Sequence, residues 1–284
     1  MLLSIIIVNY NQERYISECV SSVKKYLYCE YEIIVVNNSD EDINIEGINL
    51  IKSENKGYSF ANNNGVKSAK GEYLLFLNPD TVLTKDYSVN LFDAIKDLKF
   101  GCVGLGLCYP DKSFQLSFGV DNTFRGEIAN KKQELAVKNK SAEVIEKINT
   151  DFNTLKIVDW VSGAAMLTRK EDFIRIGKFD ERYFLYYEDA DLCLRFKLAG
   201  YNNYYLPHTE IIHLKGENTK ENFYSDTYYY AKESQLIYYK IHNGYFQYSM
   251  LRFYLFSRFL LKYLFKPDKV IFRIIKLVLK GVKV

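Results

Sequence analysis

The sequence contains few of the features that mark secreted, zinc-binding or membrane-spanning proteins. Its five cysteines are odd in number and form no Cys-x-x-Cys pair, which gives no sign of a disulfide framework or a zinc site. Residues 1–11 lack a basic n-region and are typical of a strand, not of a secretory signal. No uncharged apolar run approaches the ~18 residues that a membrane-spanning helix needs. We therefore expect reduced thiols and a cytoplasmic location.

Several nucleotide and nucleophile motifs are also missing. The sequence contains no Gly-x-Gly-x-x-Gly, no Walker motif and no Gly-x-Ser-x-Gly. A dinucleotide-dependent oxidoreductase remains an alternative only because the chain begins with alternating strand and helix patterns. The net charge of +3 over 284 residues gives no broad basic field, so we expect no nucleic-acid partner.

The charge is distributed unevenly along the chain. Residues 240–284 hold ten Lys or Arg and one acid, Asp268, so this segment carries +9 and the rest carries −6. The patterns at 245–265 and 270–284 place basic residues at short intervals among aromatic and aliphatic ones. Basic amphipathic helices of this kind lie in membrane interfaces and favour anionic lipid. The alternative is a pair of helices packed on the catalytic domain or on a partner subunit.

The chain as a whole has the composition and periodicity of a folded α/β protein, with 48% hydrophobic and 26% charged residues. Repeated strand–helix units predict a mostly parallel sheet flanked by helices. The charge-rich stretch 122–155 forms either a surface helix or a mobile excursion over the site. The expected strands are 3–8, 32–36, 48–52, 73–77, 102–107, 157–160 and 164–168, and the expected helices are 12–27, 59–69, 86–98, 170–176 and 189–198.

Polar residues follow three of the expected strands, at 9–11, 37–40 and 78–80. Ligands of parallel sheets bind beyond the carboxyl ends of the strands, so these segments predict a binding crevice. Within Asn78-Pro79-Asp80, the carboxylate either holds a divalent cation or belongs to a simple turn. His213 lies at a further strand end, where a structural role is the alternative to ligation.

A second acidic group, Glu188-Asp189-Ala190-Asp191, opens an expected helix. Acids at this position cap a helix and complement its dipole. Three acids in four positions exceed what one cap needs, and the preceding aromatic run 183–187 supplies apolar walls that raise a carboxylate's pKa. We therefore consider a general base here, with Arg195 available to pair with Asp191.

The order of these pieces is more specific than any one of them, and it resembles the family 2 glycosyltransferases. The closest likeness is to the bacterial rhamnosyltransferase-like branch, over about residues 3–215. The segments that carry the resemblance are SIIIVNYN (4–11), IIVVNNS (33–39), NKGYSFANNNG (55–65), GEYLLFLNPD (71–80), WVSGAAM (160–166), FDERYF (179–184) and YEDADLCLR (187–195).

The resemblance implies a GT-A fold and inverting transfer from a nucleotide-diphosphate sugar. Asp80, aided by His213, would hold Mg²⁺ or Mn²⁺, and Asp189, paired with Glu188, would be the general base. We expect Trp160 and Gly163 to receive the acceptor sugar. The donor-binding residues carried over are Val8, Tyr10, Asn37, Asn55, Gly57, Asn63 and Asn78.

The chain departs from the family at two of these positions. Many relatives have Asp where Asn37 stands, which removes a charge from the nucleobase pocket. Asn78 occupies the first position of the family's Asp-x-Asp metal motif, so metal binding depends on fewer carboxylates.

These observations together predict two parts. Residues 1–215 form the catalytic domain, with a nucleotide-sugar half (1–110) and an acceptor half (111–215), and residues 216–284 form a helical basic extension. We expect a peripheral enzyme at the cytoplasmic face of the plasma membrane, acting on a lipid-linked glycan in surface polysaccharide assembly. The alternatives are a UDP-galactose or UDP-N-acetylhexosamine donor, or a non-catalytic relative that binds glycan or nucleotide.

Overall fold

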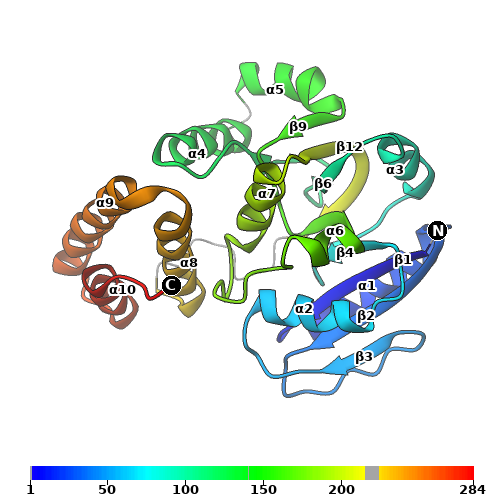
Figure 1. The fold of residues 1–284 in the computed structure, drawn as a ribbon, viewed down its shortest axis with the longest axis horizontal. Helices are drawn as coiled ribbons and strands as arrows, with labels where there is room; N and C mark the ends of the chain where they lie inside the picture. The colour runs from blue at the N-terminus through cyan, green and yellow to red at the C-terminus, as the bar shows by residue number, and fades with distance from the viewer. Residues whose placement is uncertain (1, 140, 215–223) are drawn as a thin grey trace.

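The computed structural model describes residues 2–139, 141–214 and 224–284 (Figure 1). Its centre is a ten-stranded sheet with the order β3-β2-β1-β4-β11-β6-β12-β5, and β7 and β9 pair with β6 and β12. The strand bounds are β1 (Leu2–Asn9), β2 (Glu30–Asn37), β3 (Asn49–Lys52), β4 (Tyr73–Leu77), β5 (Thr81–Val82), β6 (Phe100–Cys108), β7 (Phe114–Gln115), β9 (Lys156–Val158), β11 (Ala165–Arg169) and β12 (Asn202–His213). A separate pair joins β8 (Phe118–Gly119) and β10 (Trp160–Val161).

The N-terminal strands are parallel, as the sequence predicts. Asn9 of β1 lies opposite Asn37 of β2, and Ile7 lies opposite Leu77 of β4. The β-branched runs in β1 and β2 are buried because helices cover both faces of the sheet. The polar residues that follow these strands therefore lie at one edge, as the sequence predicts.

One central strand runs against the others. β11 pairs antiparallel with both β4 and β6, while β6 and β12 are parallel to each other. The α/β architecture is thus confirmed, and its parallel character is interrupted at β11. This reversal brings the loop before β11 to the carboxyl end of β4, where Asn78 N–H donates to Ala164 C=O at 2.9 Å.

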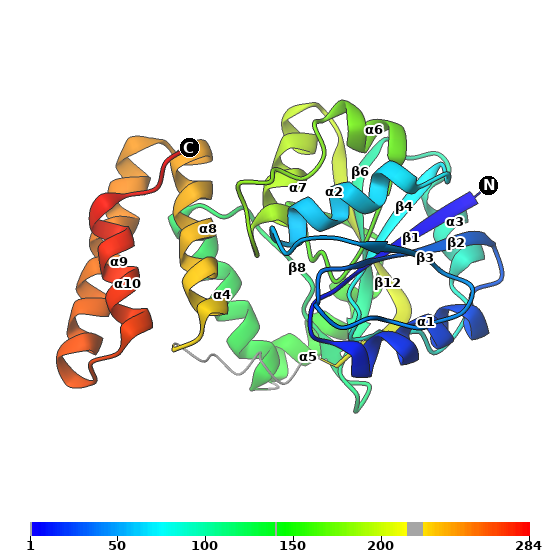
Figure 2. The ribbon, with the colours of Figure 1, turned by 90° about the horizontal axis from the view of Figure 1, so that it is seen from below.

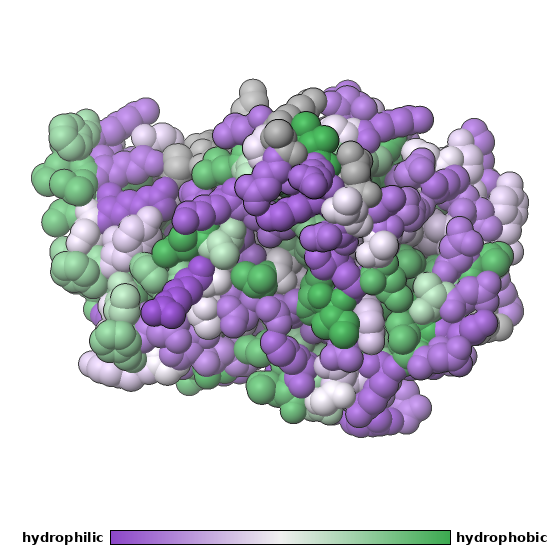
Figure 3. Space-filling model, turned by 90° about the horizontal axis from the view of Figure 1, so that it is seen from above, coloured by the Kyte–Doolittle hydropathy of each residue, from purple (hydrophilic) through white to green (hydrophobic). Residues whose placement is uncertain are grey.

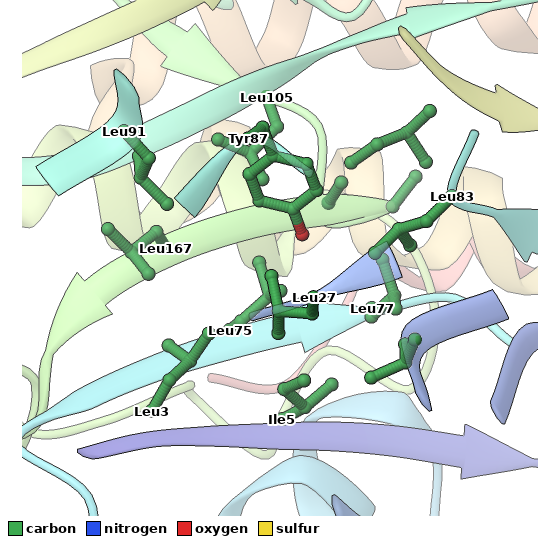
Figure 4. Packing of buried hydrophobic residues seen from close by; sticks show 14 of the residues in the cluster. Leu3, Ile5, Leu27, Leu75, Leu77, Leu83, Tyr87, Leu91, Leu105 and Leu167 are labelled. Atoms are coloured by element: carbon green, nitrogen blue, oxygen red, sulfur yellow. The ribbon is translucent and has the colours of Figure 1, made fainter. Parts of the chain in front are cut away.

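Alternate side chains of β1 enter two different apolar layers. Leu3, Ile5 and Ile7 pack with Leu75, Leu91 and Leu167 on one face (Figure 4), whereas Ile6 packs with Phe76 and Phe196 on the other. The helices that accompany this sheet are α1 (Glu13–Tyr26), α2 (Tyr58–Ser68), α3 (Ser88–Ile95), α6 (Lys170–Arg175) and α7 (Glu188–Leu198).

The charge-rich stretch 122–155 is helical. It forms α4 (Phe124–Lys138), α5 (Ala142–Asn149) and a short 3₁₀ turn (Asp151–Asn153). Thr123 begins α4 by accepting a hydrogen bond from Gly126 N–H at 3.1 Å. Of the two possibilities that the composition leaves open, the structure therefore has surface helices.

The C-terminal part forms a three-helix lobe, α8 (Asp226–His242), α9 (Gly244–Phe265) and α10 (Lys269–Lys280). Figures 1 and 2 place it at the end of the molecule opposite β3, with α8 nearest to α7 and α4. The predicted boundary at 215/216 lies outside the described residues. Among the residues that the structure describes, no helix has the length and apolar character to span a membrane.

Candidate functional site

A cavity of about 590 Å³ opens at the carboxyl ends of β1 and β2. It contains two predicted donor-binding residues, Tyr10 and Asn55. The exposed Tyr10 ring offers a surface for stacking, and Lys52 supplies a cation. Its lining residues are Tyr10, Asn11, Asn38, Ser39, Asp40, Lys52, Ser53, Glu54 and Asn55.

Asn37 adjoins this cavity without lining it. Its side-chain carbonyl accepts hydrogen bonds from Asn9 Nδ2 at 3.0 Å and from Ser39 N–H at 3.1 Å. Its Nδ2 donates to Glu41 C=O at 2.7 Å, so the amide holds the loop that follows β2. Asn38, which does line the cavity, has a buried side-chain oxygen without a hydrogen-bond partner. A nucleobase contact by Asn37 stays a prediction, and it would compete with these bonds.

Two further predicted donor residues support α2. Gly57 precedes the helix with φ +102°, and a Cβ there would lie 2.5 Å from the backbone oxygen of Phe184. Val8 packs with Val36 and Ala61. Asn63 lies away from the cavity and bonds both backbone groups of Phe179, so a donor contact by this amide would also break existing hydrogen bonds.

Asp80 and His213 are adjacent, although 133 positions separate them in the chain. The two residues meet because β5 pairs with the end of β12, with Thr81 opposite His213. His213 Nε2 lies 3.3 Å from Asp80 Oδ1, and both side chains are largely buried. His213 Nδ1 has no hydrogen-bond partner.

Asp189 lies in the first turn of α7 and contacts the loop before β11. Its Oδ2 accepts from Gly163 N–H at 3.0 Å and its Oδ1 accepts from Ala190 N–H at 2.8 Å. Burial raises the pKa of Asp189, and these hydrogen bonds offset part of that rise. Burial and the adjacent Asp189 charge raise the pKa of Glu188 well above its usual value.

The carboxylates of α7 and of the turn after β4 raise the pKa of the same two tyrosines. The pKa of Tyr58 is raised by burial and then by the charges of Glu188, Asp189 and Asp80. The pKa of Tyr186 is raised by burial and by the same three charges. Tyr58 Oη also donates to Gly163 C=O at 3.0 Å, next to the N–H that binds Asp189. Asp80, Glu188 and Asp189 are therefore all close enough to Tyr58 and Tyr186 to interact with them electrostatically.

The two predicted acceptor residues differ in how they lie relative to the region around Tyr58 and Asp189. Gly163 adjoins it directly, since a Cβ there would lie 3.5 Å from Tyr58 Oη and 3.7 Å from Asp189 Cβ. Trp160 is partly buried, and its Nε1 donates to Val120 C=O at 2.8 Å, which fixes the ring beside β8.

The backbone carbonyl of Asn78 accepts from Thr81 Oγ1 at 2.7 Å, which shapes the turn that carries Asp80.

Asp80 and His213 fit a divalent cation as two neighbouring ligands. Ligands at right angles around an ion with bonds of ~2.1 Å lie roughly 3 Å apart, close to the observed 3.3 Å. An imidazole beside a carboxylate suits Mn²⁺ better than Mg²⁺. Within the described residues no three His, Cys, Asp or Glu side chains cluster in a way that could hold a metal. The described residues thus offer two ligands, and the remaining coordination positions would fall to solvent or substrate oxygens.

Several residues at the site were not predicted from the sequence. Tyr58 follows Gly57 in one of the recognised segments, but its contact with Gly163 depends on the reversed strand β11. His242, one of only three histidines, lies 2.7 Å from Asp191 Oδ1. The predicted pair of Asp191 and Arg195 is present at 2.7 Å.

Sequence comparisons identify the proteins that this chain resembles. Residues 4–170 match the glycosyl transferase family 2 model. The chain is 30% identical over 238 residues to rhamnosyltransferase WbbL of Escherichia coli (strain K12), which covers 77% of this chain and 86% of that protein. It is 45% identical over 62 residues to the N-acetylglucosaminyl-diphospho-decaprenol L-rhamnosyltransferase of Mycobacterium tuberculosis, a match to only 20% of that protein.

Solved structures share the fold at low sequence identity. A structure of GalNAc-T7 with UDP, GalNAc and Mn²⁺ matches with a TM-score of 0.59 and 15% identity, over 88% of this chain and 50% of that one. A structure of S. aureus TarS residues 1–349 matches with a TM-score of 0.50 and 17% identity, over 84% and 65% of the two chains. These likenesses support the fold alone. Since the family model covers more than half of the sequence, the chain belongs to glycosyl transferase family 2 and is a rhamnosyltransferase-like member of it.

Proposed function

We propose that this chain transfers a sugar, with inversion, from a nucleotide-diphosphate sugar to a hydroxyl of a lipid-linked glycan, and that rhamnose is its first candidate donor sugar. The observation that carries the proposal is that the loop before β11 joins the two acidic segments, because Gly163 N–H donates to Asp189 Oδ2 and Ala164 C=O accepts from Asn78 N–H, two residues before Asp80. It supports one cleft with carboxylates from two distant parts of the chain. The similarity to rhamnosyltransferases supports the choice of sugar.

In this proposal Asp189 is the general base. It takes the proton of the acceptor hydroxyl as that oxygen attacks the anomeric carbon, and the diphosphate leaves from the opposite face through a transition state like an oxocarbenium ion. The hydrogen bonds from Gly163 and Ala190 orient the carboxylate. Burial and the Asp189 charge raise the pKa of Glu188, which favours its protonated form beside the ionised base.

The donor side is assigned to the β1–β2 edge. Tyr10, Asn38 and Asn55 would bind the nucleoside part in the 590 Å³ cavity, with Asn37 fixing the loop from behind. Asp80 and His213 would hold Mn²⁺ or Mg²⁺, which when bound offsets charge on the diphosphate. Gly163 leaves space for the acceptor sugar beside Asp189, and Trp160 supplies an apolar ring.

The acceptor side is assigned to the cytoplasmic surface of a membrane. The mycobacterial relative is named for a substrate in which decaprenol carries the sugar through a diphosphate, which supports a lipid-linked acceptor here. Neither α9 nor α10 contains Asp or Glu, and α9 exposes large apolar side chains along its 22 residues, such as Phe246, Phe253 and Leu264. A basic helix with an exposed apolar face favours anionic lipid.

The decisive experiment separates donor binding from transfer in Asp189→Asn. The donor is first identified by thermal shift with thymidine- and uridine-diphosphate sugars, including rhamnose, galactose and N-acetylhexosamine, with and without Mn²⁺. We expect Asp189→Asn to lower kcat roughly 10²–10⁴-fold with donor Kd changed less than threefold. Equal losses of rate and donor affinity would contradict the general-base assignment. Donor binding without transfer by the unmodified protein would favour the non-catalytic alternative.

A further inference from the structure

We propose that α8 positions the catalytic segment, defined here as residues 183–191, and that Gln235 does so through Glu127 and Tyr187. The inference rests on the proposed function because that segment carries Glu188 and Asp189. It assigns a role in the reaction to a helix outside the family-matched residues 4–170. It also gives the C-terminal lobe a task besides membrane contact.

The catalytic segment has a backbone that needs outside support. Tyr186 and Tyr187, immediately before Glu188, both have positive φ, +68° and +67°. Side chains other than glycine rarely adopt this conformation, and two in succession persist only where surrounding contacts fix them. The direction in which Asp189 enters the site therefore depends on what holds Tyr187.

Glu127 of α4 holds Tyr187, and Gln235 of α8 holds Glu127. Tyr187 Oη donates to Glu127 Oε1 at 2.5 Å. Gln235 Nε2 donates to both oxygens of the same carboxylate, at 2.9 and 2.7 Å. Gln235 is buried, and Glu127 and Tyr187 are partly buried, so water competes less for these hydrogen bonds than it would at an exposed surface.

Other residues on the same face of α8 contact the segment as well. Ser234 Oγ donates to Leu185 C=O at 2.9 Å, and the Tyr230 ring stacks on Phe184 with centroids 4.1 Å apart. His242 Nε2 lies 2.7 Å from Asp191 Oδ1 at the far end of the helix. Positions 230, 234 and 242 are separated by four and eight residues, the spacing that places side chains on one side of a helix.

The test exchanges the two partners of the Glu127–Gln235 pair. Gln235→Glu places two carboxylates in contact, and we expect kcat to fall at least tenfold while donor KM stays within twofold. The double variant Glu127→Gln/Gln235→Glu restores one amide and one carboxylate, and we expect it to recover kcat to within threefold of the unmodified enzyme. Lys240→Ala is the matched control, because Lys240 Nζ donates to Val282 C=O at 2.6 Å and contacts the C-terminal end of the chain instead. We expect it to lower Tm and leave kcat unchanged.

Amide hydrogen exchange of residues 184–191 supplies a readout that needs no turnover. Faster exchange in Gln235→Glu, restored in the double variant, is expected. If Gln235→Glu does not fold, Tyr187→Phe removes one hydroxyl from the chain and must give the same loss of kcat. The proposal is overturned if kcat follows Tm equally in all variants, Lys240→Ala included, or if the swap recovers nothing. Exchange changes in a protein that transfers no sugar would keep the positioning role and remove the proposed function.

Discussion

At the residue scale, the neighbouring carboxyl groups of Glu188 and Asp189 differ in the hydrogen bonds that stabilise their ionised forms. Asp189 accepts two backbone N–H groups, whereas one oxygen of Glu188 is buried without a partner. Hydrogen bonds to the ionised form lower a pKa, and burial without them raises it. Asp189 therefore ionises first, and Glu188 holds a proton into a higher pH range.

This difference makes stability depend on pH. Burial raises the pKa of Glu188 in the folded state, so the folded chain binds more protons than the unfolded one above the ordinary pKa of a glutamate. The contribution of the protonated Glu188 carboxyl to folding stability is fully present below the ordinary glutamate pKa. It is lost as the pH rises from that value through the pKa of the folded state. Glu188→Gln cannot ionise, so we expect its Tm relative to the unmodified protein to increase from pH 5 to pH 8. Thermal unfolding at both values checks this, and a constant difference would contradict it.

The glycine before α2 gives a second prediction at this scale. Gly57 has φ +102°, and a Cβ there would lie 2.5 Å from the Phe184 backbone. We expect Gly57→Ala to destabilise the fold by about 1–3 kcal/mol through backbone strain alone, and to displace the catalytic segment. Gly163→Ala is the control for stability, because its Cβ would have ordinary contacts of 3.5 Å and more. Equal Tm values for the two variants in thermal unfolding would refute this account.

A strand end is the sequence feature that best predicts which polar side chains come together in the fold. Asp80 and His213 each follow a strand, and the pairing of β5 with β12 brings them together. The sequence pattern does not reveal which amide side chains already have hydrogen-bond partners within the fold. Asn37 and Asn63 match donor-side positions, but their side chains bond to neighbouring backbone groups. Such bonds depend on the packed structure.

At the element scale, strands were predicted where β-branched residues run without interruption, as in β1 and β2. β12 was recognised only near its end, although it extends from Asn202 to His213. Its pairing register shifts between Leu206 and Ile211, and His208 and Glu210 within this stretch have positive φ. A bulge of this kind interrupts the alternation by which a strand is recognised. The sequence does not indicate α8 as a separate amphipathic helix, because its face toward the catalytic segment is polar and carries Ser234, Gln235 and His242.

The start of α10 gives the prediction for this scale. Asp268 accepts hydrogen bonds from Val270 N–H at 2.7 Å and Ile271 N–H at 3.3 Å, which satisfies two free donors of the helix. Asp268→Ala should destabilise the protein by about 0.5–2 kcal/mol. Asp268→Asn keeps an acceptor and should lose much less. Denaturant unfolding of both measures the difference, and similar losses would mean that the cap contributes little.

At the scale of the whole molecule, one end carries many of the large exposed apolar side chains. Figure 3 shows hydrophobic residues gathered at the end formed by α9 and α10. Phe253 is 75% exposed and Phe265 is 87% exposed. The sequence predicts the basic amphipathic helices, but the docking of α8 on α7 and α4 involves residues more than a hundred positions apart, such as Glu127 and Gln235. The sequence of the C-terminal helices alone therefore does not predict this docking.

Vesicle binding tests the assignment of this end to a membrane. We expect Phe253→Ser/Leu261→Ser to reduce flotation with anionic vesicles several-fold, because both side chains are exposed on α9. Binding should also weaken as salt rises, since screening reduces the attraction between the basic helices and anionic lipid. Tyr28→Ser is the matched control, because Tyr28 is 79% exposed and lies on the catalytic part instead of α9. Equal flotation of all three proteins would end the membrane proposal.

The contacts of α8 with residues 184–191 have a consequence for biosynthesis. A ribosome makes the strands of the sheet and the acids of α7 well before it makes Ser234, Gln235 and His242. The nucleotide-binding edge can form on the nascent chain, whereas the loop ahead of α7 receives its hydrogen bonds only after the lobe emerges. On the positioning role proposed for α8, competence for transfer arrives only once this first helix of the C-terminal lobe has been made.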